Sequence, residues 1–299
     1  MVHRSPLLLM CPPRHYSVCY HINPWMRVER WQRESERLTA DAHREWDSLA
    51  TTYRRLGAHV AEMPPQEGLP DMVFTANSAA VFNGTVLLSR FRHAERRGEQ
   101  VPGERTFERL RELGLVDRLV APADGEYFEG AGDCIWDAVR TVFWAGWGQR
   151  SGAGAPALIQ RAFGRAAVAL ELVDPRFYHL DTCFAVLPRG EILYYPPAFT
   201  AAALAAIHAR VAPEQRIEAS SEDALALAVN AFSFGQDVVM GACSPKLRAL
   251  LAGLGYRVHV IPLSSFNLSG GAAYCLTLRL DLDEGTLAAP MDLDPSLAA

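Results

Sequence analysis

The chain has 299 residues, 49% of them apolar and 21% charged, so it can bury a large core and does not have the composition of a disordered protein. Its formal net charge of -5 argues against nucleic acid and anionic membrane surfaces as partners, because both attract basic proteins. No apolar run approaches the roughly 18 residues that span a bilayer. The apolar run at 7–11 is also too short for the core of a secretory signal.

The six cysteines are widely spaced, and none forms the CxxC or Cys/His spacing of a zinc site. Without a secretory signal such thiols are expected to stay reduced, which predicts a cytoplasmic protein. Most of them should be small buried hydrophobes, so at most one or two are expected to be reactive.

The predicted elements follow one another without a linker-like stretch. Residues 7–11 predict a first buried strand, and residues 27–57 predict a long amphipathic helix. Asn83-Gly84 lies between two apolar runs and indicates a hairpin turn, and Arg189-Gly190 marks a similar turn farther along. Residues 244–255 predict a compact helix. We therefore expect one domain over residues 1–285 and a flexible tail over residues 286–299.

A weak internal repeat runs through these elements: a helix, a strand, a polar turn and then a strand pair. The turns that begin the strand pairs are spaced roughly 45 to 60 residues apart and carry Asp71, Glu129, His179, Asn230 and Cys275. Five such units can close into a ring whose equivalent strand ends point at one centre, or they can lie as ordinary αβ units in an open sheet. Only the ring would bring these side chains together.

Five motifs cover nearly the whole chain: PDMVFTAN (70–77), SRFRHAERRGE (89–99), FEGAGD (128–133), HLDT (179–182) and SGGAAYCLT (269–277). Each is weak alone, but in this order they resemble the guanidine-modifying, or pentein, superfamily. Its members include arginine deiminases, dimethylargininases, arginine dihydrolases and amidinotransferases. The resemblance implies an α/β fold, the five-bladed pseudo-symmetric propeller of repeated ββαβ units, with the active site on its axis.

Cys275 follows Gly270-Gly271, where the backbone can approach a ligand closely, and a strand is expected to begin at this cysteine. Taken alone, a cysteine before Leu-Thr-Leu is typical of a buried strand residue. The resemblance instead implies that Cys275 is the nucleophile. A free thiol, with a pKa of about 8.5, gives little thiolate at neutral pH. A bound guanidinium can supply the missing stabilisation of the thiolate.

The resemblance makes His179 the general acid and base, a role that suits an imidazole pKa of about 6.5; a structural role is the alternative. It makes Glu129 the partner of His179 and of the substrate guanidinium, a planar cation with five donors. Asp133 either helps to hold the cation or satisfies backbone N–H groups of its glycine turn.

Two further acids are candidate substrate contacts. Asp181 follows His179 by two residues, so the two should share one side of a strand, and deiminases have an acid here that holds the guanidinium. Asp71 matches a family contact to the α-amine or the guanidinium.

Asn77 stands where deiminases and dimethylargininases have an Asp, and it resembles the FTAN-type motif of arginine dihydrolases. An amide both donates and accepts hydrogen bonds, so it could retain a neutral ureido product for a second hydrolysis. A turn residue without contact to the substrate is the alternative.

The resemblance makes Arg90 and Arg150 candidates for the substrate carboxylate, which a guanidinium fork can bind through two hydrogen bonds; a solvated surface position is the alternative. Phe74 is expected to pack on the alkyl chain of the substrate or in the core. Asn23 lies in a Pro-flanked loop that could cover the site as a lid.

These residues predict a hydrolase that cleaves the guanidino group of arginine or a derivative through a covalent cysteine adduct, best matched by an arginine dihydrolase. A dimethylargininase or arginine deiminase, an amidinotransferase, and a non-catalytic ribosome-binding protein of the same fold remain alternatives. The partner would be a small cationic guanidino compound. Neither metal nor organic cofactor is expected, and a homo-oligomer is compatible with the sequence.

Overall fold

The computed structural model describes residues 5–284. The expected tail, residues 286–299, lies outside the described residues, as does residue 285, the end of the expected domain. The boundary between domain and tail therefore stays a prediction. Within residues 5–284, no helix has both the length and the apolar character needed to cross a membrane.

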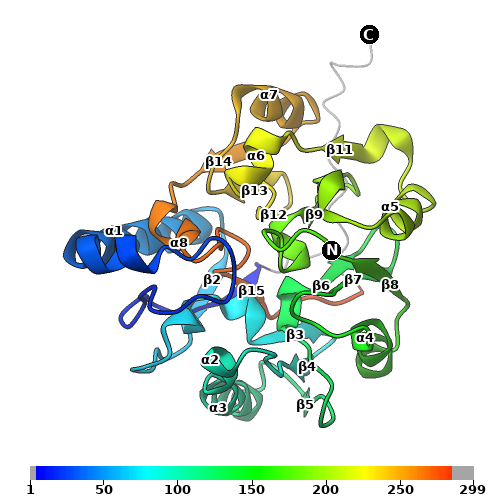
Figure 1. Ribbon diagram of the computed structural model, residues 1–299. Coiled ribbons are helices and arrows are strands. Elements are labelled where there is room, and N and C mark those ends of the chain that lie inside the picture. The colour runs from blue at the N-terminus through cyan, green and yellow to red at the C-terminus, as the bar shows by residue number, and fades with distance from the viewer. Residues whose placement is uncertain (1–4, 285–299) are drawn as a thin grey trace.

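Five small sheets are arranged in a ring around one axis (Figure 1). Each has a middle strand that pairs antiparallel with one neighbour and parallel with the other. The predicted five-bladed α/β propeller is thereby confirmed. In blade order the strands are β15 (Leu278–Arg279), β1 (Leu7–Met10) and β2 (His59–Glu62); β3 (Ala79–Phe82), β4 (Thr85–Leu88) and β5 (Arg118–Val120); β6 (Cys134–Asp137), β7 (Val142–Trp147) and β8 (Ala167–Glu171); β9 (Phe184–Val186), β10 (Ile192–Tyr194) and β11 (Arg216–Glu218); β12 (Phe232–Phe234), β13 (Asp237–Met240) and β14 (Arg257–Val260).

A helix joins the middle strand of each blade to its parallel partner and packs on the outside of the ring (Figure 1). This crossover is what a parallel pair requires. The five helices are α1 (Val28–Arg55), α3 (Gln100–Glu112), α4 (Ala155–Phe163), α5 (Ala201–His208) and α7 (Pro245–Gly253). Shorter helices are α2 (Ala94–Arg97), α6 (Ser221–Leu225) and α8 (Ser264–Asn267).

The two helices predicted from the sequence are confirmed as α1 and α7. The buried positions of α1 recur at helical spacing, which gives it one apolar face toward the core, and they include Trp31, Leu38, Trp46 and Tyr53. At the start of α7, the Ser244 hydroxyl accepts a hydrogen bond from the backbone N–H of Leu247, an N-cap that fixes where the helix begins.

Both predicted turns are also present. Asn83 and Gly84 have φ angles of 46° and 67°, the left-handed pair that a two-residue turn needs to join β3 to β4. Between β9 and β10 the chain reverses through Arg189 and Gly190, and Gly190 has a φ of 96°. Glycine is suited to that conformation because it has no Cβ.

The ring is closed by β1, the predicted first strand. It pairs antiparallel with β15 from the other end of the described chain, Leu8 opposite Arg279, and parallel with β2. Residues from both ends therefore build one blade.

Candidate active site

Short 3-10 turns carry candidate residues to the start of the inner strand of several blades. They are η1 (Pro70–Val73), η2 (Thr75–Asn77), η3 (Gly130–Gly132) and η4 (Leu180–Thr182). Asp71 lies in η1, Asn77 ends η2, and Glu129 and His179 immediately precede η3 and η4. All four side chains are buried. A charge or hydrogen bond at this centre therefore acts with little screening by water.

Two local expectations are wrong. Asp181 does not share a strand face with His179, because residues 180–182 form η4 and a 3-10 turn rotates successive side chains by about a third of a circle. His179 therefore meets Glu129, whereas Asp181 meets Cys275. Cys275 does not begin a strand either: it lies in a turn that ends before β15 starts at Leu278.

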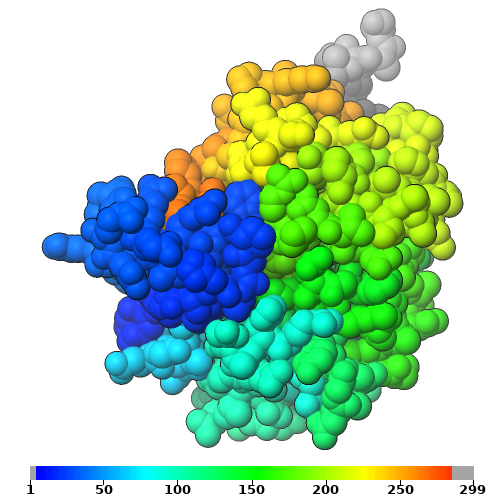
Figure 2. Space-filling view, viewed as in Figure 1, coloured from blue at the N-terminus to red at the C-terminus, as the bar shows by residue number. Residues whose placement is uncertain are grey.

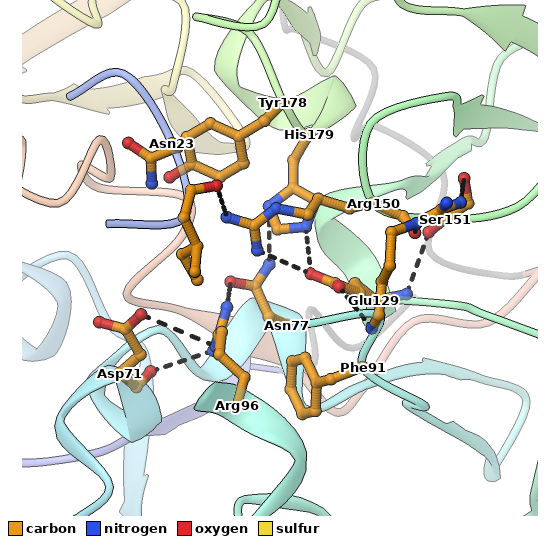
Figure 3. A network of polar contacts seen from close by, with 12 residues as sticks. Asn23, Asp71, Asn77, Phe91, Arg96, Glu129, Arg150, Ser151, Tyr178 and His179 are labelled. Atoms are coloured by element: carbon orange, nitrogen blue, oxygen red, sulfur yellow. Dashed lines mark hydrogen bonds and ion pairs between the residues drawn. The ribbon is translucent and has the colours of Figure 1, made fainter. Parts of the chain in front are cut away.

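His179 and Glu129 form a buried pair at the centre of the site (Figure 3). Nε2 of His179 lies 2.8 Å from Oε2 of Glu129, which also accepts a hydrogen bond from Nη1 of Arg150 at 3.1 Å. Burial raises the pKa of Glu129, but Arg150 and His179 outweigh it and hold that pKa below its usual value. The ionised carboxylate then accepts the N–H on Nε2, which leaves Nδ1 on the side of the ring that faces the Asn77 amide.

Cys275 faces Asp181 and Asn230. Its thiol donates to Oδ2 of Asp181 at 3.0 Å and receives a hydrogen bond from Nδ2 of Asn230 at 3.1 Å. Burial, followed by the Asp181 charge, raises the pKa of Cys275 well above its usual value. Burial also raises the pKa of Asp181, to about 7. The resting cysteine is thus a protonated thiol, and a cation beside it would favour the thiolate.

Two buried carboxylate oxygens in this region lack a donor. Oδ1 of Asp71 and Oδ1 of Asp181 have no donor within hydrogen-bond geometry among the described residues. Burial raises the pKa of both carboxyl groups, and its effect is larger than that of the nearby Tyr20 hydroxyl, which lowers the pKa of Asp71, and of the Asn230 amide, which lowers that of Asp181. Buried acceptors without a donor are unfavourable, so these atoms mark positions where a donor-rich ligand would be stabilised.

Asn77 lies between Arg96 and His179 (Figure 3). Its Oδ1 accepts from Nη1 of Arg96 at 2.9 Å, and its Nδ2 lies 3.4 Å from Nδ1 of His179. A guanidinium can only donate, so Arg96 fixes the orientation of this amide and turns its N–H group toward His179.

Arg96, which the sequence did not single out, is a buried centre of this network. It forms two hydrogen bonds of 2.8 Å with Glu99 and lies 3.9 Å from Oδ2 of Asp71. Burial raises the pKa of Glu99 to about 7 although Arg96 opposes it. The position of Arg96 in the RRGE run was the only sequence signal for its role. A sequence does not show whether an arginine is buried or exposed, so this signal could not single it out.

The two predicted carboxylate-binding arginines lie in different environments. Arg150 is buried, contacts Glu129 and stacks over the Tyr178 ring at 4.6 Å. Arg90 is partly exposed, and its guanidinium binds Asp124 and the carbonyl of Pro122. The buried Arg96 is therefore a better candidate than Arg90 to bind a substrate carboxylate together with Arg150.

Asp133 holds the backbone segments that carry His179 and Glu129 through hydrogen bonds. Its Oδ1 accepts the backbone N–H of Leu180 at 2.9 Å, and its Oδ2 accepts the Ser151 hydroxyl at 2.6 Å. Ser151 Oγ in turn accepts the N–H of Glu129 at 3.0 Å. Burial raises the pKa of Asp133 to about 6. These contacts favour the backbone role that the sequence left open, applied to the segments that carry His179 and Glu129.

The segment around Asn23 covers the site. Nδ2 of Asn23 donates to the Ser269 carbonyl at 3.0 Å, and the Trp25 indole donates to the Arg176 carbonyl at 2.6 Å. In Figure 2 this blue segment meets the green surface of the middle repeats. Phe74 packs edge-on against Tyr16 in a buried apolar cluster, and its contact with the substrate's alkyl chain stays a prediction.

Among residues 5–284, no group of three or more His, Cys, Asp or Glu side chains is arranged to hold a metal ion.

Comparison with known proteins gives consistent matches over most of the chain. The family model described as N,N dimethylarginine dimethylhydrolase, eukaryotic, matches residues 22–280. The bifunctional arginine dihydrolase/ornithine cyclodeaminase ArgZ of Synechocystis is 42% identical over 91% of this chain. This chain spans only 37% of that longer protein.

A second relative and a solved structure match nearly end to end. The N(G),N(G)-dimethylarginine dimethylaminohydrolase of Mycobacterium tuberculosis is 37% identical over 93% of this chain and 86% of its own. The substrate-bound crystal structure of the N-terminal domain of ArgZ, an arginine dihydrolase, has a TM-score of 0.87 at 39% identity and covers 94% of this chain and 100% of that domain. The chain belongs to the dimethylarginine dimethylhydrolase family of guanidine-modifying penteins.

Proposed function

We propose that this chain hydrolyses the guanidino group of arginine through a covalent adduct on Cys275, as an arginine dihydrolase. The observation that carries the hydrolase proposal is the pair of buried contacts at the centre of the ring, Cys275 with Asp181 and His179 with Glu129. They support a nucleophile and an acid–base group that act in one buried site, because Tyr178, next to His179, is coupled electrostatically to Cys275 and Asp181.

Binding of the cation begins the reaction. A guanidinium offers five N–H donors, and the unpaired oxygens of Asp71 and Asp181 are acceptors for such a ligand, one of them beside the nucleophile. The positive charge next to Sγ lowers the pKa of the Cys275 thiol, and the thiol proton passes to His179. Arg150 and Arg96 are the candidates for the substrate carboxylate.

Covalent chemistry follows in two steps. The Cys275 thiolate bonds to the guanidino carbon, the bond from that carbon to the departing nitrogen breaks, and His179 gives this nitrogen a proton. Water then gives a proton to His179 and attacks the same carbon, and the carbon–sulfur bond breaks. Glu129 stabilises the imidazolium that His179 forms when it holds the thiol proton and again when it holds the proton from water, which returns to the sulfur as the carbon–sulfur bond breaks. No metal or organic cofactor is required.

The choice of product rests on Asn77. Because Arg96 occupies its oxygen, Asn77 offers an N–H group toward His179. An N–H group suits the carbonyl oxygen of a ureido compound, whereas a carboxylate would suit a guanidinium. Citrulline could therefore stay for a second hydrolysis, so that arginine and two waters give ornithine, two ammonia and carbon dioxide.

A dimethylargininase that releases citrulline is the second candidate, favoured by the description of the matching family model. An arginine dihydrolase releases ornithine and ammonia from arginine, whereas a dimethylargininase releases citrulline and methylamines from methylated arginines. The protein should be incubated separately with arginine, methylated arginines, agmatine and citrulline, and ornithine, citrulline, ammonia and methylamines should be quantified.

Ornithine with two ammonia per arginine is the expected result, and it should be lost in Cys275→Ser. Methylamine release from methylated arginines with citrulline as end product would establish the second candidate instead. If no guanidino compound is consumed and Cys275→Ser matches the wild type, the hydrolase proposal is wrong.

The role of Asn77 has a test of its own. Asn77→Asp keeps an acceptor for Arg96 but turns a carboxylate oxygen toward His179, so ornithine release should fall at least tenfold while citrulline accumulates. Asn83→Asp, a matched exchange in the hairpin turn, should leave the product ratio unchanged. Undiminished ornithine release by Asn77→Asp would contradict the assignment.

A further inference from the structure

Asn230 occupies the fourth of the five equivalent turns, just before β12, and its side chain is fully buried. The turn that precedes it contains Leu227 with a φ of 56°, a left-handed conformation that is uncommon for a residue with a Cβ. The backbone N–H of Asn230 bonds to the Leu227 carbonyl at 3.1 Å.

The amide of Asn230 makes four hydrogen bonds. Oδ1 accepts the backbone N–H groups of Ala272 at 2.9 Å and Cys275 at 3.2 Å. Nδ2 donates to the carbonyl of Asp181 at 3.0 Å and to Sγ of Cys275 at 3.1 Å. Both donors and both acceptor positions of the amide are thus in use.

The orientation of this amide follows from its partners. A backbone N–H can only donate, so the two N–H groups of the nucleophile turn must face Oδ1. That leaves the NH₂ group to face the sulfur. The fold therefore presents a donor, and not an acceptor, to the atom that must carry a negative charge.

Burial and the carboxylate beside the sulfur raise the pKa of the Cys275 thiol, whereas the backbone N–H of Ala272 also lowers it. Asp181 is the carboxylate in contact with the sulfur, and burial and this charge disfavour the thiolate. Tyr178 and Tyr274 are the further titratable side chains whose electrostatics couple to the thiol. Among these groups Asn230 supplies the neutral side-chain N–H that stabilises a charged sulfur.

We propose that Asn230 is the positioning residue of the nucleophile: its amide holds the turn that carries Cys275 against the segment that carries Asp181 and donates a hydrogen bond that stabilises the thiolate. The catalytic meaning of this role rests on the proposed function. The contact between Asn230 and Cys275 does not depend on that proposal.

The test is the rate at which iodoacetamide alkylates Cys275 as a function of pH, quantified by mass spectrometry of the peptide that contains it. Asn230→Asp keeps the two acceptor contacts and replaces the donor with a carboxylate oxygen. Because a hydrogen bond to a charged group is involved, alkylation near neutral pH should fall roughly ten- to a hundredfold and the profile should shift to higher pH. Asn83→Asp serves as the matched control and should follow the wild-type profile.

Asn230→Ala provides a second variant in case Asn230→Asp does not fold, and melting temperatures show that each protein is folded. The alanine variant should also alkylate more slowly, and with arginine its kcat should fall more than its KM rises. Folded variants whose alkylation profiles coincide with wild type would overturn the proposal and leave Asn230 a structural residue. If no guanidino compound is turned over by wild type, the proposed function fails, but the alkylation profiles still decide the role of Asn230.

Discussion

The buried carboxyl group of Asp181 couples the stability of the protein to pH. Its pKa is raised to about 7 by burial, against about 3.9 in an unfolded chain. A carboxyl whose pKa is raised on folding favours the folded state most at low pH. That contribution is present below about pH 4 and is lost as the pH rises through about 7.

Asp181→Asn removes this titration. Relative to wild type, the variant should gain stability as the pH rises from about 5 to about 8, by roughly 1–3 kcal/mol. Thermal unfolding of both proteins across this range measures the difference, with Asp124→Asn as control because Asp124 is fully exposed. A difference between variant and wild type that stays constant with pH would contradict the raised pKa.

The 3-10 turns place the functional side chains only because glycines leave them room. A Cβ built on Gly132 in η3 would lie 2.5 Å from Nδ2 of Asn77 and 3.4 Å from the His179 ring. At 2.5 Å it would displace the amide that faces His179. The absence of a side chain at Gly132 therefore allows Asn77 and His179, from neighbouring blades, to approach each other.

Gly132→Ala should lower guanidino hydrolysis at least tenfold, because the Asn77 amide must shift away from the imidazole. Gly103→Ala, a matched exchange in α3 with no atom within 4 Å of the added Cβ, should retain activity and gain about 0.5–1 kcal/mol of stability. Steady-state kinetics and denaturant unfolding of both variants give the comparison. Wild-type kinetics in Gly132→Ala would show that the turn tolerates the extra carbon.

Elements with strong local signals were predictable from the sequence. The apolar spacing of α1 and the Asn83-Gly84 turn are dictated by residues a few positions apart. The neighbours of Asp181 and Arg96 were not predictable in this way. Asp181 was misplaced because η4 replaces an expected strand, and Arg96 is buried because Asn77, from another segment, meets it. Such contacts depend on tertiary packing, which no local pattern encodes.

At the scale of the whole molecule, the five blades depend on one another. Strand β1, near the start of the described residues, pairs with β15, near their end. Unfolding of any one blade would therefore break the closed ring. The repeat in the sequence indicated equivalent units, and the pairing that closes them is a long-range contact. A closed ring predicts one cooperative unfolding transition over the described residues.

Fluorine NMR of the protein labelled with fluorotryptophan tests this prediction, because each tryptophan reports on its own surroundings. Trp31 and Trp46 lie in α1 of the blade that closes the ring, and Trp136 and Trp144 lie in the third blade. Their signals should change at one urea concentration. Loss of the α1 signals before those of the third blade would show that the closing blade unfolds separately.

The burial of the reactive groups has a consequence for speed. Cys275 is 2% exposed and His179 and Glu129 are 0% exposed, beneath a segment held by the contacts of Asn23 and Trp25. Every turnover therefore requires this segment to move through solvent twice, once for entry and once for release. That movement works against the friction of the surrounding liquid, so under the proposed function the turnover rate should fall as the viscosity of the solvent is raised.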